Sequence, residues 1–313
     1  MRKVKPKRLS KGDVIGVIAP ASYPANPERI EKGVKYLEQL GYRVEVGTNV
    51  GQERGYLAGE DSQRLEDLHS MFKNKHVKAI FCVRGGYGAG RLLDKIDFNL
   101  IAKNPKIFVG YSDITVLQLA FYKKTGLVTF AGPMVAVDFV DEISPFTEEI
   151  FWKTITSNKK IGRLENPNDE KILAITKGSS MGTLLGGNLA LIMSIFGTEF
   201  LPDFKNSILL IEDIGEAPYR VDRMFNQLKI AKIFKNIRGM ILGDFIDCHE
   251  PDPDKKTLTL NEVIADYLQK LNIPVLYNLK HGHIKHNITI PFGVKCKINS
   301  TKKFIEITES AVS

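Results

Sequence analysis

Short apolar runs alternate with stretches of helical periodicity over the first 130 residues, and this alternation constrains the fold more than any other feature of the sequence. The predicted strands are residues 14–19, 42–46, 79–83, 107–109 and 128–130, and the predicted helices are 27–40, 62–72 and the stretch after Ser112. Strands that alternate with helices form a parallel sheet with helices on both faces. Because ligands of such sheets bind at the carboxyl ends of the strands, we look for chemistry in the loops that follow them.

The alternating pattern weakens between residues 138 and 177, where charged residues and the turn-forming run Asn166-Pro-Asn-Asp169 are frequent. We therefore expect an N-terminal α/β domain at 1–150, a linker at 151–177 and a C-terminal domain at 178–313. The C-terminal part begins with a glycine-rich segment, 178–188, which is interpreted as a loop before an apolar helix. Further predictions are strands at 207–211, 239–243 and 274–276, helices at 221–230 and 260–271, and a terminal hairpin at 295–299 and 304–308.

Ser112 is predicted to lie on a sharp turn between a strand and a helix. The apolar run 107–109 precedes Gly110, and apolar residues at helical spacing follow Ser112. A hydroxyl on such a turn is exposed beside backbone N–H groups at a helix N-terminus, as in nucleophilic serines. The match to the G-x-S-x-G motif is partial, because Ile114 occupies the last glycine position. The alternative is that Ser112 or Asp113 only caps the helix.

A glycine-rich segment, Arg84-Gly-Gly-Tyr-Gly-Ala-Gly-Arg91, directly follows the predicted strand 79–83. It has neither the G-x-G-x-x-G spacing of dinucleotide-binding loops nor the G-K-[ST] of phosphate loops. Glycines at the end of a strand allow backbone N–H groups to approach a ligand oxygen closely. The alternative is a plain tight turn.

Glu212 and a histidine cluster are the candidates in the second half. Glu212 follows an apolar run, so its carboxylate can orient an imidazole at a strand end; the alternative is a cap or a salt bridge. The segment around His283, flanked by His281 and His286, suits a loop that presents one imidazole as a general base. A zinc site would instead combine these three histidines with Cys248 or His249, but no ligand spacing on a helix supports it.

Ser112, Glu212 and His283 occur in the chain order nucleophile, acid, base, as in α/β hydrolases. In such a triad, His283 takes the proton of Ser112 while Glu212 fixes the tautomer of the imidazole. The N–H groups of Gly86 and Asp113 are the candidate donors that would hold the oxyanion.

Six blocks between residues 84 and 293 resemble, in order, the signature blocks of the LD-carboxypeptidase family of serine peptidases. The N-terminal segments Gly12-Asp13 with Ala19-Pro20 and Gly55-Tyr-Leu-Ala-Gly59 extend the resemblance over nearly the whole chain. That family includes murein tetrapeptide carboxypeptidases and microcin C self-immunity peptidases. The blocks are Arg84-Gly-Gly-Tyr-Gly-Ala-Gly-Arg91, Gly110-Tyr-Ser-Asp-Ile-Thr115, Gly132-Pro-Met134, Gly186-Gly-Asn-Leu189, Ile211-Glu-Asp-Ile-Gly-Glu-Ala-Pro-Tyr-Arg-Val-Asp-Arg223, and Gly282-His283 with Pro291-Phe-Gly293.

The resemblance implies a Ser-His-Glu triad of Ser112, His283 and Glu212, with oxyanion donors at Gly86 and Asp113. It also implies a flavodoxin-like or Rossmann-like N-terminal domain with a parallel sheet, a smaller β-rich C-terminal domain of the swivelling β/α type, and a homodimer. Two positions depart from the family pattern: Ala131, where the family often has His, and His281, where an apolar residue is frequent. Neither touches the triad, but both affect the expectation for the substrate pocket.

Composition excludes several other functions. The net charge of +8 is spread along the chain, and no zinc-finger spacing or RNA-binding strand motif is present, so no nucleic-acid partner is expected. The longest apolar stretch, 184–196, is too short to span a bilayer, so no membrane partner is expected. The cysteines, Cys82, Cys248 and Cys296, are odd in number and widely separated, as in reduced cytoplasmic proteins.

The leading interpretation is a cytoplasmic serine carboxypeptidase without metal or other cofactor. It would release the terminal D-alanine from small murein tetrapeptides during cell-wall recycling, by way of an acyl-enzyme on Ser112. One alternative is a microcin-C-type peptidase that cleaves peptidyl or aminoacyl adenylates. An alternative of another class is a non-catalytic module that binds a nucleotide or a sugar.

Overall fold

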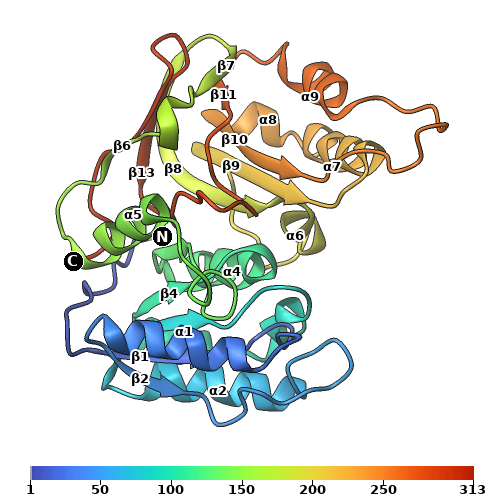
Figure 1. The fold of residues 1–313 in the computed structure, drawn as a ribbon. Helices are drawn as coiled ribbons and strands as arrows, with labels where there is room; N and C mark the ends of the chain where they lie inside the picture. Colours follow the sequence, from blue (N-terminus) through green and yellow to red (C-terminus); the bar gives the residue numbers. More distant parts are fainter. Residues whose placement is uncertain (1) are drawn as a thin grey trace.

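The computed structural model describes residues 2–313 and contains two sheets, the first built mainly from the N-terminal half (Figure 1). Its strands are β1 (Val14–Ile18), β2 (Arg43–Val46), β3 (Val77–Cys82), β4 (Ile107–Val109), β5 (Thr129–Ala131) and β12 (Ile290–Phe292). Their order is β12-β5-β4-β3-β1-β2, and all neighbours from β5 to β2 run parallel. The predicted parallel sheet is therefore confirmed.

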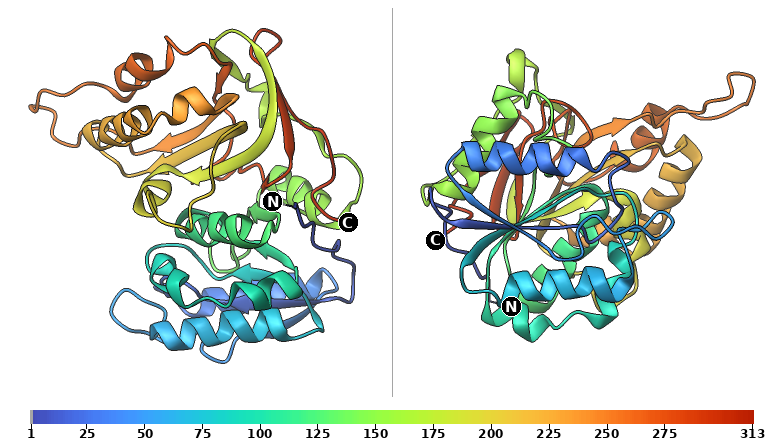
Figure 2. Two further views of the ribbon diagram at one scale, coloured as in Figure 1. Left: turned by 180° about the vertical axis from the view of Figure 1, so that it is seen from behind. Right: turned by 60° about the horizontal axis from the view of Figure 1, so that its bottom comes forward.

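Helices cover both faces of this sheet. They are α1 (Glu28–Gln39), α2 (Asp61–Lys73), α3 (Phe98–Lys103) and α4 (Thr115–Thr125), with short 3-10 turns η1 (Ala89–Lys95) and η2 (Ser112–Ile114). The right-hand view of Figure 2 shows α1 on one face and α2 on the other. In α1, Ile30 and Leu37 are buried while Glu31 and Lys35 are exposed, as an amphipathic pattern requires. Helix α4 lies between the two sheets, so all its residues from 115 to 121 are buried.

The second sheet is mixed. Its strands are β6 (Gly162–Leu164), β7 (Leu173–Thr176), β8 (Ser179–Asn188), β9 (Ser207–Ile214), β10 (Gly239–Ile246), β11 (Val275–Tyr277), β13 (Lys295–Asn299) and β14 (Phe304–Ile307). They lie in the order β6-β14-β13-β8-β9-β10-β11-β7, and the central neighbours from β8 to β11 run parallel. The predicted terminal hairpin is confirmed as β13 and β14, which pair antiparallel.

Helix α5 (Pro145–Thr156) packs against the first sheet, where its Phe151 contacts Phe81 of β3. The remaining helices belong to the second half of the chain. They are α6 (Leu189–Ser194), α7 (Pro218–Ile230), α8 (Ile233–Asn236) and α9 (Leu260–Leu268), with the 3-10 turn η3 (Pro167–Asp169). No helix within residues 2–313 is both long and apolar enough to cross a membrane.

The glycine-rich segment 178–188, predicted as a loop, is instead the long strand β8. Two of its glycines, Gly182 and Gly186, lie where neighbouring backbone leaves no room for a side chain: a Cβ atom at Gly186 would lie 1.7 Å from the carbonyl oxygen of Leu210 on β9. Glycine in a strand often marks such a close approach, which is a tertiary contact that local patterns do not reveal.

The chain crosses between the two sheets more than once. Strands β6 and β7 lie within 151–177, the stretch predicted as a linker, and both belong to the second sheet. Strand β12 leaves the C-terminal half and pairs antiparallel with β5 of the first sheet. The proposed domain boundaries therefore stay predictions, and the regular structure in 151–177 is a finding that the polar, proline-containing sequence did not indicate.

Candidate active site

Ser112 lies at the carboxyl end of β4, where the backbone turns sharply into η2 and α4. Its φ angle is 62°, in the left-handed region that residues other than glycine seldom adopt. A Cβ atom at Gly110 would lie 2.9 Å from Cγ1 of Ile114, so the turn needs a glycine there. Neither η2 nor α4 has a side-chain cap, so the alternative role of Ser112 or Asp113 as a helix cap is not realised. A strained serine between strand and helix is the geometry of a nucleophile elbow.

The glycine loop after β3 lies directly over this serine. A Cβ atom at Gly85 would lie 2.8 Å from Cβ of Ser112 and 3.3 Å from the backbone nitrogen of Asp113. The next residue, Gly86, has a φ of 106°, and a Cβ atom there would lie 2.6 Å from Oγ of Ser22. The loop therefore needs Gly86 for its conformation and Gly85 for its close approach to Ser112.

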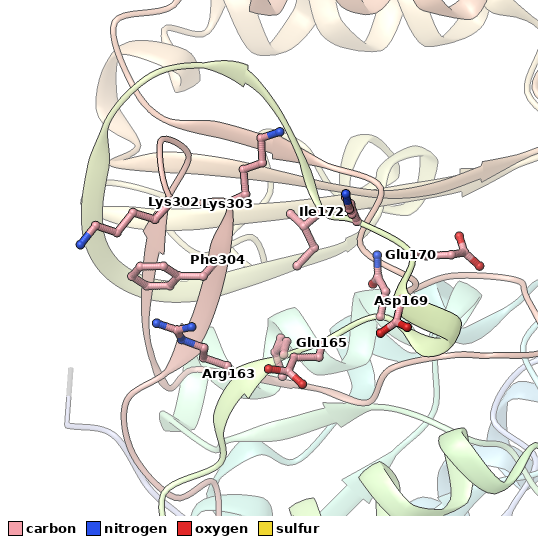
Figure 3. A pocket seen from close by; sticks show the side chains of 11 residues that line it. Arg163, Glu165, Asp169, Glu170, Ile172, Lys302, Lys303 and Phe304 are labelled. Atoms are coloured by element: carbon pink, nitrogen blue, oxygen red, sulfur yellow. The ribbon is translucent and has the colours of Figure 1, made fainter.

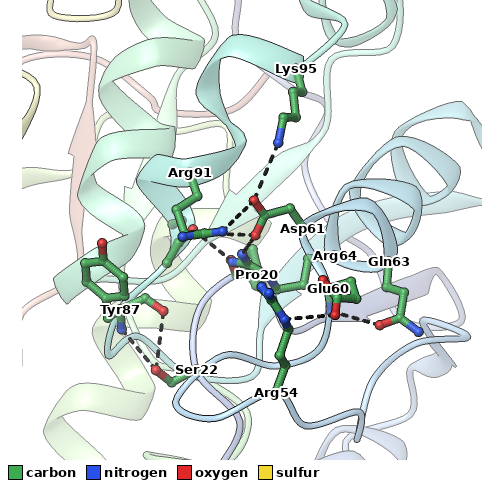
Figure 4. Close-up of polar contacts among 12 residues, drawn as sticks. Pro20, Ser22, Arg54, Glu60, Asp61, Gln63, Arg64, Tyr87, Arg91 and Lys95 are labelled. Atoms are coloured by element: carbon green, nitrogen blue, oxygen red, sulfur yellow. Dashed lines mark hydrogen bonds and ion pairs between the residues drawn. The ribbon is translucent and has the colours of Figure 1, made fainter.

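Hydrogen bonds hold the glycine loop from outside (Figure 4). The N–H of Tyr87 donates to Oγ of Ser22 at 3.0 Å. The buried Arg64 donates to the carbonyl oxygens of Pro20 at 2.6 Å and Gly88 at 2.9 Å. Asp61 in turn pairs with Arg64. The loop is thus fixed to α2 and to the segment after β1.

The two N–H groups predicted to hold an oxyanion are free. Within residues 2–313, the backbone N–H groups of Gly86 and Asp113 donate no hydrogen bond to another protein group. The carboxylate of Asp113 turns to the loop instead and accepts from the N–H of Ala89 at 2.8 Å. Burial raises the pKa of this carboxyl to about 6, although the bond from Ala89 acts in the opposite direction. The side chain of Asp113 therefore anchors the loop, which leaves its backbone N–H available.

Glu212 and His283 meet in the second half of the molecule. Oε2 of Glu212, which lies on β9 and is 1% exposed, is 2.9 Å from Nδ1 of His283. A carboxylate in this position fixes the imidazole with its other nitrogen, Nε2, free to act as a base. The structure therefore brings together the predicted acid and the predicted base, although 71 positions separate them in the sequence.

The loop that carries His283 is held by buried polar groups. The N–H of Gly282 donates to Oδ1 of Asn287 at 3.2 Å, and the N–H of Asn287 donates to Oγ1 of Thr147 on α5 at 2.8 Å. Gly282 has a φ of 137°, and a Cβ atom there would lie 3.0 Å from Oε2 of Glu212. A glycine next to His283 is therefore required for the close approach of Glu212.

His283 also contacts the residue before the candidate nucleophile. Its ring packs edge-to-face on Tyr111, with the ring centroids 5.2 Å apart. Within residues 2–313, Oγ of Ser112 forms no hydrogen bond with His283. Catalytic hydrogen bonds are often long without substrate and shorten when it binds, so the contact through Tyr111 is the structural link between the base and the serine turn.

The other two histidines of the cluster have separate partners. Nδ1 of His281 donates to the carbonyl oxygen of Ile288 at 2.7 Å, and burial lowers the pKa of this imidazole. Nδ1 of His286 lies 2.7 Å from Oγ of Ser144. No group of three or more His, Cys, Asp or Glu residues in the described part of the chain is arranged to hold a metal ion. Ala131, the other departure from the family pattern, is buried on β5.

Asp138 is a residue of the site that the sequence patterns did not single out. The N–H of Met134 donates to its Oδ2 at 2.8 Å, and the carboxyl lies beside Tyr111 and near His283. Burial raises the pKa of Asp138 to about 6, while its polar neighbours and the charge of His283 lower it. It lies in the irregular stretch after β5, where no periodicity could have indicated its position.

Of two surface cavities, the smaller lies beside the candidate site. One of about 270 Å³ opens beside Asp113 and the glycine loop and is also lined by Leu191 and Ile195. A larger one, of about 470 Å³, lies along β6 and β14 between charged side chains such as Arg163 and Glu165 (Figure 3). The larger cavity contains none of the candidate catalytic residues, so size alone does not indicate where the chemistry takes place.

Comparisons with known proteins identify the family of the chain. Family models described as the LD-carboxypeptidase N-terminal domain and C-terminal domain match residues 15–132 and 181–298. A probable murein peptide carboxypeptidase of Bacillus subtilis is 42% identical over 315 residues, which cover 99% of this chain and 95% of the relative.

Two solved structures are also similar. The microcin C7 self-immunity protein MccF in complex with glutamyl sulfamoyl guanosine superimposes with a TM-score of 0.87 at 29% identity, covering 99% of both chains. The muramoyltetrapeptide carboxypeptidase from Oxalobacter formigenes superimposes with a TM-score of 0.81 at 33% identity, covering 93% of this chain and 97% of that one.

Proposed function

The chain belongs to the LD-carboxypeptidase family of serine peptidases, and on this premise we propose that it releases the terminal D-alanine from murein tetrapeptides. The similarity to a probable murein peptide carboxypeptidase and to a muramoyltetrapeptide carboxypeptidase supports this substrate class. The observation that carries the proposal is the bond between Glu212 and His283, because it prepares an imidazole to act as a base near Ser112.

In the proposed mechanism, Nε2 of His283 takes the proton of the Ser112 hydroxyl as Oγ attacks the scissile carbonyl carbon. Glu212 accepts the hydrogen bond from Nδ1 and stabilises the imidazolium that forms. The free N–H groups of Gly86 and Asp113 stabilise the negative charge on the carbonyl oxygen. His283 then gives its proton to the amino group of the departing D-alanine, which leaves an acyl-enzyme on Ser112. Water, activated by the same imidazole, hydrolyses that ester.

A second candidate function has one specific observation in its favour: a structural neighbour with a TM-score of 0.87 is MccF, in complex with glutamyl sulfamoyl guanosine. A microcin-C-type peptidase would use the same triad on a peptidyl or aminoacyl adenylate. The identity to this neighbour is 29%, against 42% to the murein peptide relative, and therefore supports the alternative less strongly.

The decisive experiment gives the purified protein a murein tetrapeptide and, separately, an aminoacyl sulfamoyl adenylate, and follows the products by mass spectrometry. We expect release of D-alanine from the tetrapeptide and no cleavage of the adenylate analogue. Cleavage of the adenylate analogue alone would establish the second candidate. A fluorophosphonate probe that labels the wild type but not Ser112→Ala would separate both from a non-catalytic binding module.

We further propose that the protein acts in the cytoplasm as a homodimer. All three cysteines, Cys82, Cys248 and Cys296, are free and buried, as suits a reducing compartment. Light scattering coupled to size exclusion tests the dimer, and fractionation of cells tests the compartment.

A further inference from the structure

Arg84, the first residue of the glycine loop, carries a charge that the protein itself does not neutralise. Its Nη1 donates to the carbonyl oxygen of Tyr23 at 3.3 Å, and its Nε is buried without a partner. No carboxylate within residues 2–313 forms an ion pair with it. Several other arginines are paired with carboxylates. Arg54 pairs with Glu60, and Arg64 and Arg91 pair with Asp61 (Figure 4). Arg29 pairs with Asp141.

A guanidinium N–H that is buried without an acceptor raises the free energy of the folded protein. A guanidinium stays protonated, so it cannot avoid the cost of desolvation by losing its proton. A buried donor that has no acceptor also loses the free energy of the hydrogen bond that water would have made. In the free protein the half-buried Arg84 therefore has a buried Nε–H without an acceptor, and an anion from outside would supply one.

The position of Arg84 indicates which anion from outside the protein would bind to it. A Cβ atom at Gly86 would lie 3.7 Å from Nη2 of Arg84, so the guanidinium lies next to the N–H that is predicted to hold the oxyanion. The same guanidinium is near Tyr111, which precedes Ser112: burial raises the pKa of the Tyr111 phenol, and the charge of Arg84 acts against that shift. The guanidinium of Arg84 thus lies on the side of the glycine loop, beside the backbone of Gly86.

We propose that Arg84 forms the subsite for the terminal carboxylate of the peptide substrate. This inference rests on the proposed function. In a peptide that loses its last residue, the terminal carboxylate lies one residue beyond the scissile carbonyl, a span of about 3.5 Å. A guanidinium matches a carboxylate with two parallel hydrogen bonds, which a substrate without the charge cannot accept. The subsite explains in physical terms why such a site would remove a terminal residue and leave internal bonds uncut.

The test compares two substrates that differ only in this group: a murein tetrapeptide that ends in D-alanine, and the same peptide ending in D-alaninamide. For the wild type, we expect kcat/KM to be higher for the free acid by about 10²-fold or more. Arg84→Gln should lower kcat/KM for the acid by a similar factor and leave that for the amide nearly unchanged, so that the preference disappears. Arg54→Gln, which removes an exposed arginine that Glu60 already pairs, should keep the wild-type preference.

A second variant, which retains the charge, keeps the test valid if Arg84→Gln does not fold. Arg84→Lys keeps the positive charge but loses the planar fork, so it should retain an intermediate preference for the acid. Circular dichroism of both variants checks that they are folded. If Arg84→Gln does not fold, the preference of the wild type and its reduction in Arg84→Lys decide the question.

The outcomes for the function and for the subsite are distinct. If the wild type releases neither D-alanine from the acid nor D-alaninamide from the amide, the proposed function fails and the subsite with it. If the wild type cleaves acid and amide equally well, or if folded Arg84 variants keep the full preference for the acid, the subsite is wrong while the peptidase function stands.

Discussion

Oε2 of Glu212 lies 2.9 Å from Nδ1 of His283, and the ring of the same histidine contacts Tyr111, the residue before Ser112. This single imidazole therefore connects a buried carboxylate of the second sheet to the serine turn of the first. The contact joins the two halves of the chain at the point where the proposed chemistry takes place.

Glu212→Gln and His283→Ala should each lower kcat severely, by about 10⁴-fold for Glu212→Gln, because the glutamine removes the charge that supports the imidazolium. Their combination should be far less than additive, since residues that act as one unit fail together. A double-mutant cycle on kcat/KM with folded proteins measures this. His286→Ala, whose ring bonds to Ser144, is the matched control and should change KM at most. Independent, multiplying losses would mean that Glu212 and His283 do not form one relay.

Ser112→Ala should abolish turnover, with a loss in kcat of about 10⁴-fold to 10⁶-fold, because the nucleophile is removed. The variant should fold, since alanine differs from serine only by the hydroxyl and the strained φ of 62° is present in both. Release of D-alanine and circular dichroism are measured on the same preparation. Activity close to that of the wild type would exclude Ser112 from the mechanism.

Gly85→Ala should lower kcat by about 10²-fold or more, because the added methyl group would lie 2.8 Å from Cβ of Ser112 and force the loop away from it. Gly90→Ala is the matched control in the same segment: its Cβ atom would have no neighbour within 4 Å, so activity should stay at the wild-type level. Steady-state kinetics of both variants test the prediction. Equal activities would show that the loop can move away from Ser112 without loss of function.

Asp113→Asn should make the stability of the protein less sensitive to pH. Burial raises the pKa of Asp113 from 3.8 to about 6 in the folded state. The folded protein therefore binds this proton more tightly than the unfolded chain does, and the associated stability falls as pH rises from about 4 to about 6. In the wild type, ionisation of Asp113 lowers the free energy of unfolding by at most about 3 kcal/mol as pH rises, and the asparagine variant does not lose this contribution. Urea unfolding of both proteins at pH 4.5 and pH 7 measures the difference, and a difference that does not change with pH would contradict the assignment.

Activity should survive treatment with EDTA. Each imidazole of the cluster has a separate partner: Ile288 for His281, Glu212 for His283 and Ser144 for His286. Rates before and after chelation and dialysis, and after re-addition of zinc, measure the effect. Loss on chelation followed by recovery with zinc would support the zinc-site interpretation instead.

The sequence by itself determined the elements that depend on near neighbours. Apolar runs and helical spacing predicted the parallel sheet of the first half, because periodicity reflects which side of an element is buried. The change from strand to helix at Ser112 was predicted for the same reason, and the structure adds its φ of 62°. The family blocks then assigned roles to Glu212 and His283 through resemblance.

Tertiary structure decided which residues far apart in the sequence contact one another. The segment 178–188 has the composition of a loop, yet it is a strand, because Gly186 meets the carbonyl oxygen of Leu210 on the neighbouring strand. Strand β12 joins the first sheet although it comes from the end of the chain. The missing partner of Arg84, the burial of Asp138 and the 2.9 Å contact between Glu212 and His283 depend on groups far apart in sequence. Such contacts arise only when the sheets pack together, and no local pattern encodes them.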